Sequence, residues 1–279
     1  MLKLRIITAL ILLAIFLPAF FADAAEPLAC LTLLLIAAGA WEWGRLIGLT
    51  RLPALGAGVG CVLLCLLSWW LGLPQHETPV LWSVIGGLWV LAGAWMVHRG
   101  LAAWASVPQF LKLLGGTLAL WMCWLAIFQA KRMGVNFLLS VFVLVWVADI
   151  AAYFAGKALG RRKLAPSLSP GKSWEGVWGG IGGVWVLDFA WVWVDQSLAM
   201  DSQSIFSVLS ERGWFYFLVA ITFLTAMSVV GDLVESMVKR SAGAKDSSQL
   251  LPGHGGVLDR VDALLPTLPL AMMLTQSVV

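Results

Sequence analysis

The chain has 279 residues, of which 61% are apolar and only 12% are charged, and its mean hydropathy is +0.90. Soluble domains carry about 45–50% apolar and about 25% charged residues, so this composition argues strongly against a water-soluble globule. The formal net charge of +3 is too small to indicate a nucleic-acid partner. We therefore expect lipid to surround much of this chain.

Long apolar runs predict an all-α, polytopic integral membrane protein with about nine transmembrane helices. A run of about 20 residues crosses the hydrocarbon layer as a helix, because 1.5 Å per residue must cover roughly 30 Å. A closed barrel would show short alternating segments instead. The runs lie near Ile6–Ala22, Leu28–Leu46, Pro53–Leu73, Pro79–Val97, Phe110–Ala130, Gly134–Ala155, Gly176–Val194, Trp214–Gly231 and Val261–Val279. The first has about 17 apolar residues, beyond the usual 7–15 of a signal-peptide core, so we expect it to be retained.

The distribution of basic residues predicts the orientation. Nine crossings put the two termini on opposite sides of the membrane. If the N-terminus is cytoplasmic, that side receives 15 of the 18 Lys and Arg residues, and the far side receives only Lys131, Arg132 and Arg212. Basic residues favour the cytoplasmic side, so we predict an N-in, C-out topology.

The sequence divides into two regions of different chemical character. Residues 1–133 hold the first five runs, and residues 134–279 hold the other four together with two long cytoplasmic loops, Gly156–Glu175 and Asp232–Asp262. Seven of the nine carboxylates that remain after the far-side acids are removed lie in or beside these loops. A membrane protein that gathers acids at one face is building a site there, so we expect the C-terminal region to be catalytic.

Helical spacing sharpens this expectation, because residues three or four apart share a face of a helix. Three helix ends then present carboxylates at the same depth. Oxygen ligands from separate elements suit a hard cation such as Mg²⁺, which takes few carboxylates and shares its other positions with water and substrate phosphates. Acids are not the residues that snorkel at this face, so we favour a metal site over ordinary juxtamembrane charge. The residues that share a face are Asp149, Tyr153 and Lys157; Asp232, Ser236, Lys239 and Arg240; and Asp259 with Asp262.

Phosphate-binding groups lie between these carboxylates. Lys and Arg neutralise phosphate, and Arg does so with two parallel hydrogen bonds. The segment Pro252-Gly253-His254-Gly255-Gly256 predicts a turn whose backbone amides approach an anion closely, just before a helix N-terminus. Glycines at 176, 179, 180 and 183 predict close helix packing instead of a ligand site.

Cations, carboxylates and a glycine turn at a membrane surface indicate metal-assisted chemistry on phosphates, with a lipid headgroup as the natural acceptor.

Two alternative functions stay open. A CTP-dependent polyprenol kinase would use similar groups but release CDP. An ion-coupled transporter would need ionisable residues near the bilayer midplane, whereas most acids here crowd one surface.

Three segments resemble the motifs of phosphatidate cytidylyltransferases, also called CDP-diacylglycerol synthases. The most specific is Ser236-x-x-Lys239-Arg240, then Lys245-Asp246, then Pro252-Gly253-His254-Gly255-Gly256-x-x-Asp259-Arg260-x-Asp262, in which every charged position is filled. Asp149–Gly156 and Ser169–Gly176 are similar to the two preceding motifs of that family. The resemblance covers the C-terminal half, and the first five runs carry no matching motif.

The resemblance implies transfer of a cytidylyl group from CTP to phosphatidic acid, which gives CDP-diacylglycerol and pyrophosphate. It also implies Mg²⁺, with a monovalent cation as a second expectation, a bacterial inner membrane with the active site facing the cytoplasm, and a homodimer. Our hypothesis for the reaction is direct in-line attack by a phosphatidate oxygen on the α-phosphorus of CTP. A phosphate monoester with a second pKa of about 6 is already a nucleophile near neutral pH.

The resemblance further implies a role for each matching residue. The metal-binding residues would be Asp232, Asp259 and Asp262. The substrate-binding residues would be Ser236, Lys239, Arg240, Lys245, Gly255, Gly256 and Arg260. The catalytic residues would be Asp149, Lys172, Ser173, Glu175, Asp246 and His254.

Overall fold

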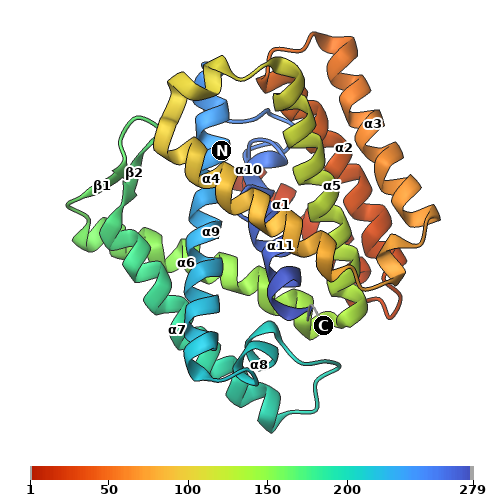
Figure 1. Ribbon diagram of the computed structural model, residues 1–279, viewed down its shortest axis with the longest axis vertical. Helices are drawn as coiled ribbons and strands as arrows, with labels where there is room; N and C mark the ends of the chain where they lie inside the picture. Colours follow the sequence, from red (N-terminus) through yellow and green to blue (C-terminus); the bar gives the residue numbers. More distant parts are fainter. Residues whose placement is uncertain (1, 277–279) are drawn as a thin grey trace.

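The computed structural model describes residues 2–276, and its secondary structure is mostly helical (Figure 1). Helices break where the sequence supplies glycine or proline; Gly134, with a φ of +141°, separates two long helices. The elements are α1 (Leu2–Phe21), α2 (Glu26–Leu46), α3 (Arg51–Trp70), the 3-10 turn η1 (Leu73–Gln75), α4 (Pro79–Ser106), α5 (Gln109–Met133), α6 (Val135–Leu159), β1 (Lys163–Ala165), β2 (Ser169–Ser173), α7 (Trp174–Ser197), α8 (Ile205–Ser210), α9 (Trp214–Ser241), α10 (Leu258–Val261) and α11 (Leu264–Thr275).

Seven of these helices, α2 to α7 and α9, are long and apolar enough to cross a membrane. The protein is therefore a polytopic membrane protein, as the composition predicts. The other two predicted runs form shorter helices: α1 has an apolar stretch from Ile6 to Phe21, and α11 has 12 residues. The last three residues of the predicted ninth run, 277–279, lie outside the described residues.

A short antiparallel hairpin interrupts the helices within the first cytoplasmic loop, where we predicted no regular structure. Strand β1 pairs with β2 in the register Lys163 with Ser173 and Ala165 with Ser169. Pro166 and Pro170 disfavour helix here, because proline lacks the amide that a helix interior needs. In Figure 1 the hairpin projects beside the ends of α6 and α7, so it extends the motif loop away from the bundle.

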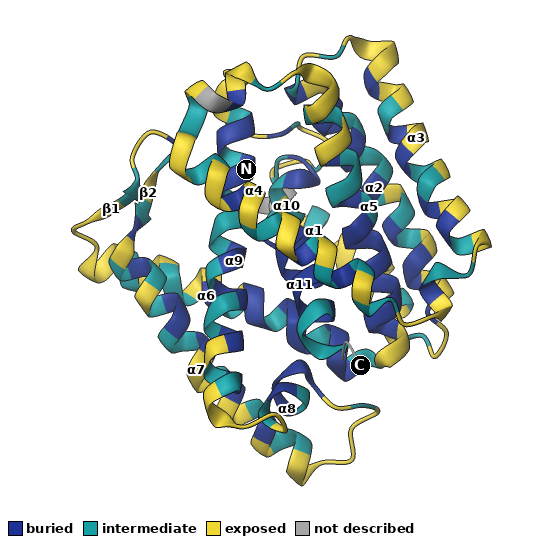
Figure 2. Cartoon of the chain, in the orientation of Figure 1, coloured by how far each residue is buried: buried dark blue, intermediate teal, exposed yellow. Residues whose placement is uncertain are grey.

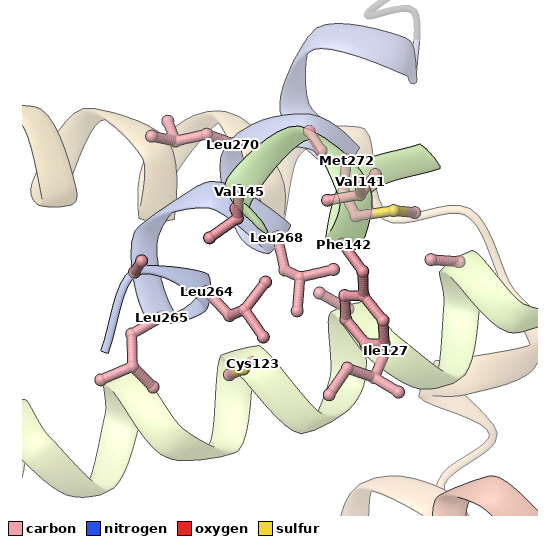
Figure 3. Close-up of a cluster of buried hydrophobic side chains, with 14 of the residues drawn as sticks. Cys123, Ile127, Val141, Phe142, Val145, Leu264, Leu265, Leu268, Leu270 and Met272 are labelled. Carbon is pink, nitrogen blue, oxygen red and sulfur yellow. The ribbon is translucent and has the colours of Figure 1, made fainter. Parts of the chain in front are cut away.

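The centre of the bundle is α11. This helix packs against α4, α5, α6 and α9, and all of its residues from Leu264 to Met272 are buried. In Figure 3, Leu264 and Leu268 lie among Cys123 and Ile127 of α5 and side chains of α6. The outward faces of α3 and α4 are largely exposed and apolar, as expected where lipid is the solvent (Figure 2).

Helices α6 and α7 pack closely through the predicted glycines. A Cβ atom on Gly180 would lie 2.9 Å from the carbonyl oxygen of Ala148, and one on Gly176 would lie 2.9 Å from that of Ala152. A backbone atom cannot rotate away as a side chain can, so only glycine allows this approach. The close packing fixes α7, and with it the end of the hairpin, against α6.

Gly180→Val is therefore expected to destabilise the fold. The two added methyl groups would press on the backbone of α6, and overpacking of this kind costs about 1–3 kcal/mol. The measurement is the thermal unfolding midpoint of the purified protein in detergent. Gly182→Val is the matched control, because a Cβ at Gly182 meets no atom within 4 Å. Equal midpoints for the two variants would contradict the packing argument.

Candidate active site

The first polar cluster joins the two long loops, Gly156–Glu175 (the first motif loop) and Asp232–Asp262 (the second motif loop). Lys172 of β2 places its Nζ atom 2.6 Å from Oδ2 of Asp232, and Ser236 donates a hydrogen bond of 3.1 Å to Oδ1 of the same carboxylate. Asp149 of α6 interacts electrostatically with Lys172 and Asp232. Asp262, between α10 and α11, interacts with Asp232 as well. We call Asp149, Lys172, Asp232 and Asp262 the Asp232 group.

The carboxyl group of Asp262 has an elevated pKa. Burial and, second, the negative charge of Asp232 together raise this pKa to about 7. The backbone amide of Ala263 donates a hydrogen bond of 2.9 Å to Oδ1. Two carboxylates that interact repel each other unless a cation or a proton lies between them.

The second cluster is built around one lysine. The Nζ atom of Lys239 lies 2.5 Å from Oε2 of Glu235 and 2.6 Å from Oδ1 of Asp259. The other oxygen of Asp259 accepts hydrogen bonds from Ser247 N and Oγ, both 2.9 Å, and from Gly256 N at 2.8 Å. Burial opposes ionisation of Asp259, but these hydrogen bonds and the Lys239 charge lower its pKa to about 2. We call Glu235, Lys239 and Asp259 the Lys239 group.

The three carboxylates that we predicted as metal ligands have different direct partners. Asp232 pairs with Lys172 and interacts with Asp262, whereas Lys239 and two loop residues use both oxygens of Asp259. Asp262 also interacts electrostatically with Glu235 and Lys239, so the two groups are neighbours. Over residues 2–276, no three His, Cys, Asp or Glu side chains come together as a metal-binding group. The chemistry of Asp232 and Asp262 still fits Mg²⁺, which takes one or two carboxylates and leaves its other positions to substrate oxygens.

The predicted glycine turn is present. Leu251 N donates to Gly255 O, His254 N donates to Leu251 O, and Gly253 and Gly255 have φ angles of +79° and +82°. Arg260 braces the turn, because Nε and Nη2 of its guanidinium donate to His254 O at 3.0 and 2.6 Å. This contact is internal to the loop, whereas the resemblance had implied a substrate contact.

The amide of Gly256, the last residue of this turn, and the two amides that follow it already donate to carboxylates of the protein. Gly256 N donates to Asp259, and Val257 N and Leu258 N donate to Glu42 at 2.9 and 2.8 Å. The protein's own carboxylates therefore occupy the N-terminus of α10. These amides position the loop, and they are not free to bind an anion.

Glu42 is the residue that sequence analysis missed. Its carboxylate lies fully buried within α2 and accepts hydrogen bonds from Val257 N, Leu258 N and the hydroxyls of Ser247 and Ser248. An acid inside an apolar helix is a signal that could have drawn attention to it. Its partners lie more than 200 residues away in the sequence, so no local pattern could name them.

Two predicted catalytic residues hold the first motif loop in shape. The Ser173 hydroxyl caps α7 by accepting a hydrogen bond of 3.2 Å from Gly176 N. Glu175 accepts hydrogen bonds from Arg161 N and Arg162 N, just after α6 ends. These contacts give both side chains a structural role, and the catalytic roles of Ser173 and Glu175 stay predictions.

The remaining predicted residues lie at the loop surface. Lys245 and Asp246 line a polar pocket of about 700 Å³, to which α2 contributes Arg45. Arg240 turns away from Lys239 and donates to Leu168 O at 3.4 Å and to Ala244 O at 3.1 Å. The charged residues of the motif that begins at Ser236 therefore lie at several neighbouring sites and do not converge on one point.

Opposed carboxylates and lysines at one end of a helical bundle define a membrane protein with a polar, potentially catalytic centre. A family model described as the cytidylyltransferase family matches residues 3–278. The phosphatidate cytidylyltransferase of Pseudomonas aeruginosa is 39% identical over 96% of this chain and 95% of its own. Proteins of the same name from Haemophilus influenzae and Bacillus subtilis are 49% and 38% identical, each over 49% of this chain and over 44% and 46% of their own. The chain therefore belongs to the cytidylyltransferase family, which confirms the resemblance.

Glu42→Gln is expected to loosen the second motif loop. Glutamine keeps the size of the side chain but loses one acceptor oxygen and the charge, so a buried amide loses its partner at a cost of about 1–3 kcal/mol. The measurement is the rate of tryptic cleavage after Lys245 and Arg260, which should rise several-fold. Glu26→Gln, at an exposed position at the start of α2, is the control. An unchanged cleavage rate in Glu42→Gln would show that the loop holds its shape without this carboxylate.

Proposed function

We propose that the protein transfers a cytidylyl group from CTP to phosphatidic acid and releases pyrophosphate and CDP-diacylglycerol. The observation that carries this proposal is the Asp232 group, in which Lys172 of the loop Gly156–Glu175 meets Asp232 of α9 at 2.6 Å. Paired cations and carboxylates suit a reaction between two anionic phosphates, because both reactants need neutralising. Family membership and the names of the relatives support the same reaction.

We propose Asp232 and Asp262 as the Mg²⁺ ligands. Their carboxylates lie close enough to interact, and both are oxygen donors at a site shared with Lys172. Mg²⁺ bound there would offset charge on the reacting phosphate oxygens. Asp259, the third predicted ligand, could join them only after its contact with Lys239 breaks. A monovalent cation beside Mg²⁺ stays a further prediction.

The lysines then serve as phosphate-binding groups. Lys172 and Lys239 each sit within 2.6 Å of a carboxylate oxygen, so these carboxylates orient the two ammonium groups before substrate binds. A phosphatidate oxygen, already anionic near neutral pH, attacks the α-phosphorus of CTP in line with the departing pyrophosphate. No strong general base is needed for this step, since the nucleophile has no proton to lose.

We also propose the N-in orientation in a bacterial inner membrane, with the site at the cytoplasmic face. The polar groups lie at the end of α9 and in the two long loops, which carry nine of the 18 Lys and Arg residues. The nine-crossing topology requires α10 and α11 to cross together. Asp262 and Ala263 have right-handed helical backbone angles, so the path from Leu258 to Thr275 is roughly 27 Å long at 1.5 Å per residue.

The homodimer stays a prediction, which cross-linking in native membranes would test.

The defining experiment is incubation of the purified protein with labelled CTP and phosphatidic acid. We expect CDP-diacylglycerol and pyrophosphate in equal amounts, and loss of both when a chelator removes divalent cations. Release of CDP with a phosphorylated lipid product would identify a kinase instead. Ion flux in proteoliposomes without turnover of CTP would favour a transporter.

Asp232→Asn, Asp259→Asn and Asp262→Asn are each expected to lower turnover by roughly 10²-fold or more, because each removes a charge that organises the phosphates. Asp188→Asn is the matched control, since Asp188 is fully buried in α7, outside both polar groups. Near-normal turnover in Asp232→Asn and Asp262→Asn would contradict the proposed metal ligands. Thermal unfolding of all four variants checks that the fold is retained.

A further inference from the structure

An apolar groove lies beside the polar site. Its volume is about 290 Å³, and residues of α2, α4, α5, α9 and α11 line it. Four tryptophans contribute to its walls, and their residue numbers are 43, 89, 95 and 104. The volume is close to the lower end of the roughly 300–1,000 Å³ typical of ligand pockets. An apolar space of this size suits one flexible hydrocarbon chain.

The groove exists because α4 and α5 pack on different partners. Helix α4 packs against α9 and α11, whereas α5 packs mainly against α2, α3, α6 and α11. Figure 1 shows α4 crossing the bundle obliquely in front of α9. Small residues on the facing surfaces, Ala92 of α4 and Gly115 and Ala119 of α5, leave the space between the two helices open.

The groove opens sideways toward lipid and is closed at its floor. At the rim, Leu88, Trp95 and Leu111 are 55%, 43% and 51% exposed, so they face the hydrocarbon of the bilayer. At the floor, Leu120 and Met122 are buried. A lipid chain can therefore pass from the bilayer into the groove without crossing polar surface.

The floor of the groove meets both polar groups. Glu235, which lines the groove, lies 2.5 Å from Lys239 through its Oε2 atom. Gly231 also lines the groove, and a Cβ on it would lie 2.4 Å from the carbonyl oxygen of Asp262. A lipid whose acyl chain lies in the groove would thus have its headgroup end near the Lys239 and Asp232 groups.

We propose that this groove holds one acyl chain of the phosphatidic acid substrate; the assignment rests on the proposed function. The occupant must be apolar along its length and carry an anionic phosphate at the end nearest the lysines, and this lipid meets both requirements. Transfer of a chain from bilayer to groove exchanges one apolar surrounding for another, so hydrophobic burial contributes little. The groove instead orients the lipid, so that its phosphate arrives at the polar site in a fixed direction.

The proposal gives the N-terminal helices a function. Residues 1–133 match none of the family motifs, yet α2, α4 and α5 supply most of the groove. Bulky tryptophans form broad, rigid walls, while Lys112 at the cytoplasmic end packs its ammonium group over the ring of Trp104 at 5.2 Å. The N-terminal region would then select and align the lipid, and the C-terminal region would carry out the transfer.

The test is to fill the groove without disturbing the helices. Gly115→Leu adds a side chain where a Cβ meets no atom within 4 Å, and leucine favours helix more than glycine does. Ala92→Leu fills the facing wall. Gly87→Leu is the control, because Gly87 lies on α4 in open space and does not line the groove.

We expect both groove variants to lower kcat/KM for dioleoyl phosphatidic acid at least tenfold, to change that for the dihexanoyl lipid less than twofold, and to leave the KM for CTP unchanged. The control should behave as the wild type does. Equal losses with both lipids, or no loss with either, would overturn the proposal.

A binding readout separates this inference from the proposed function. A phosphatidic acid with a photoactivatable diazirine near its chain end should label α4 and α5 in wild-type protein, and Gly115→Leu should abolish this labelling. Labelling spread evenly over all lipid-facing helices would show ordinary bilayer contact and would refute the groove assignment. If labelling is confined to the groove but no CDP-diacylglycerol forms, the proposed function fails and the lipid site stands.

Discussion

The site depends on one constraint, which is that a buried carboxylate within it is stabilised by hydrogen-bond donors or by a cation. Glu42 meets it with two backbone amides and two serine hydroxyls, all from a loop more than 200 residues away. Asp259 meets it with Lys239, a serine and an amide of the same loop. The two acids use the loop to satisfy their own buried charge, and in doing so they fix its shape. Structure and polar chemistry therefore cannot be separated in this region.

Helix α9 coordinates the arrangement, because Asp232, Glu235 and Lys239 all lie in its last turns. Spacing of three and four residues turns Glu235 and Lys239 toward each other, and Ser236 toward Asp232. Asp232 then meets the loop Gly156–Glu175 through Lys172, while Lys239 meets Asp259 at the far end of the loop Asp232–Asp262. One helix thereby joins segments that are separate in the sequence, and the helical repeat alone determines which residue meets which segment.

Sequence periodicity was sufficient for what depends on local geometry. It predicted the apolar helices, the shared face of Asp232 and Ser236, the turn around Gly253 and Gly255, and close helix packing around Gly180. It failed where long-range contacts decide. The sequence around Glu42 does not identify the partners of its carboxylate. The three-residue spacing placed Asp259 and Asp262 on a common face, but it could not show that Lys239 and Ser247 bind Asp259 directly. Propensity also missed the hairpin β1–β2, whose short strands alternate too little to stand out.

The position of the polar groups relative to the apolar groove bears on selectivity. An enzyme that joins a water-soluble nucleotide to a membrane lipid must bring a polar and an apolar reactant to one point. Here the boundary between the two environments runs through α9: Val234 and Gly231 line the groove, while Asp232 and Lys239 lie in the polar groups. If the groove holds the acyl chain as proposed, a lipid aligned along this boundary would present its phosphate to the lysines, whereas a soluble phosphate has no chain to hold it there. Discrimination between the two would then require no specific contact with the glycerol, because geometry alone would determine which phosphate stays long enough to react.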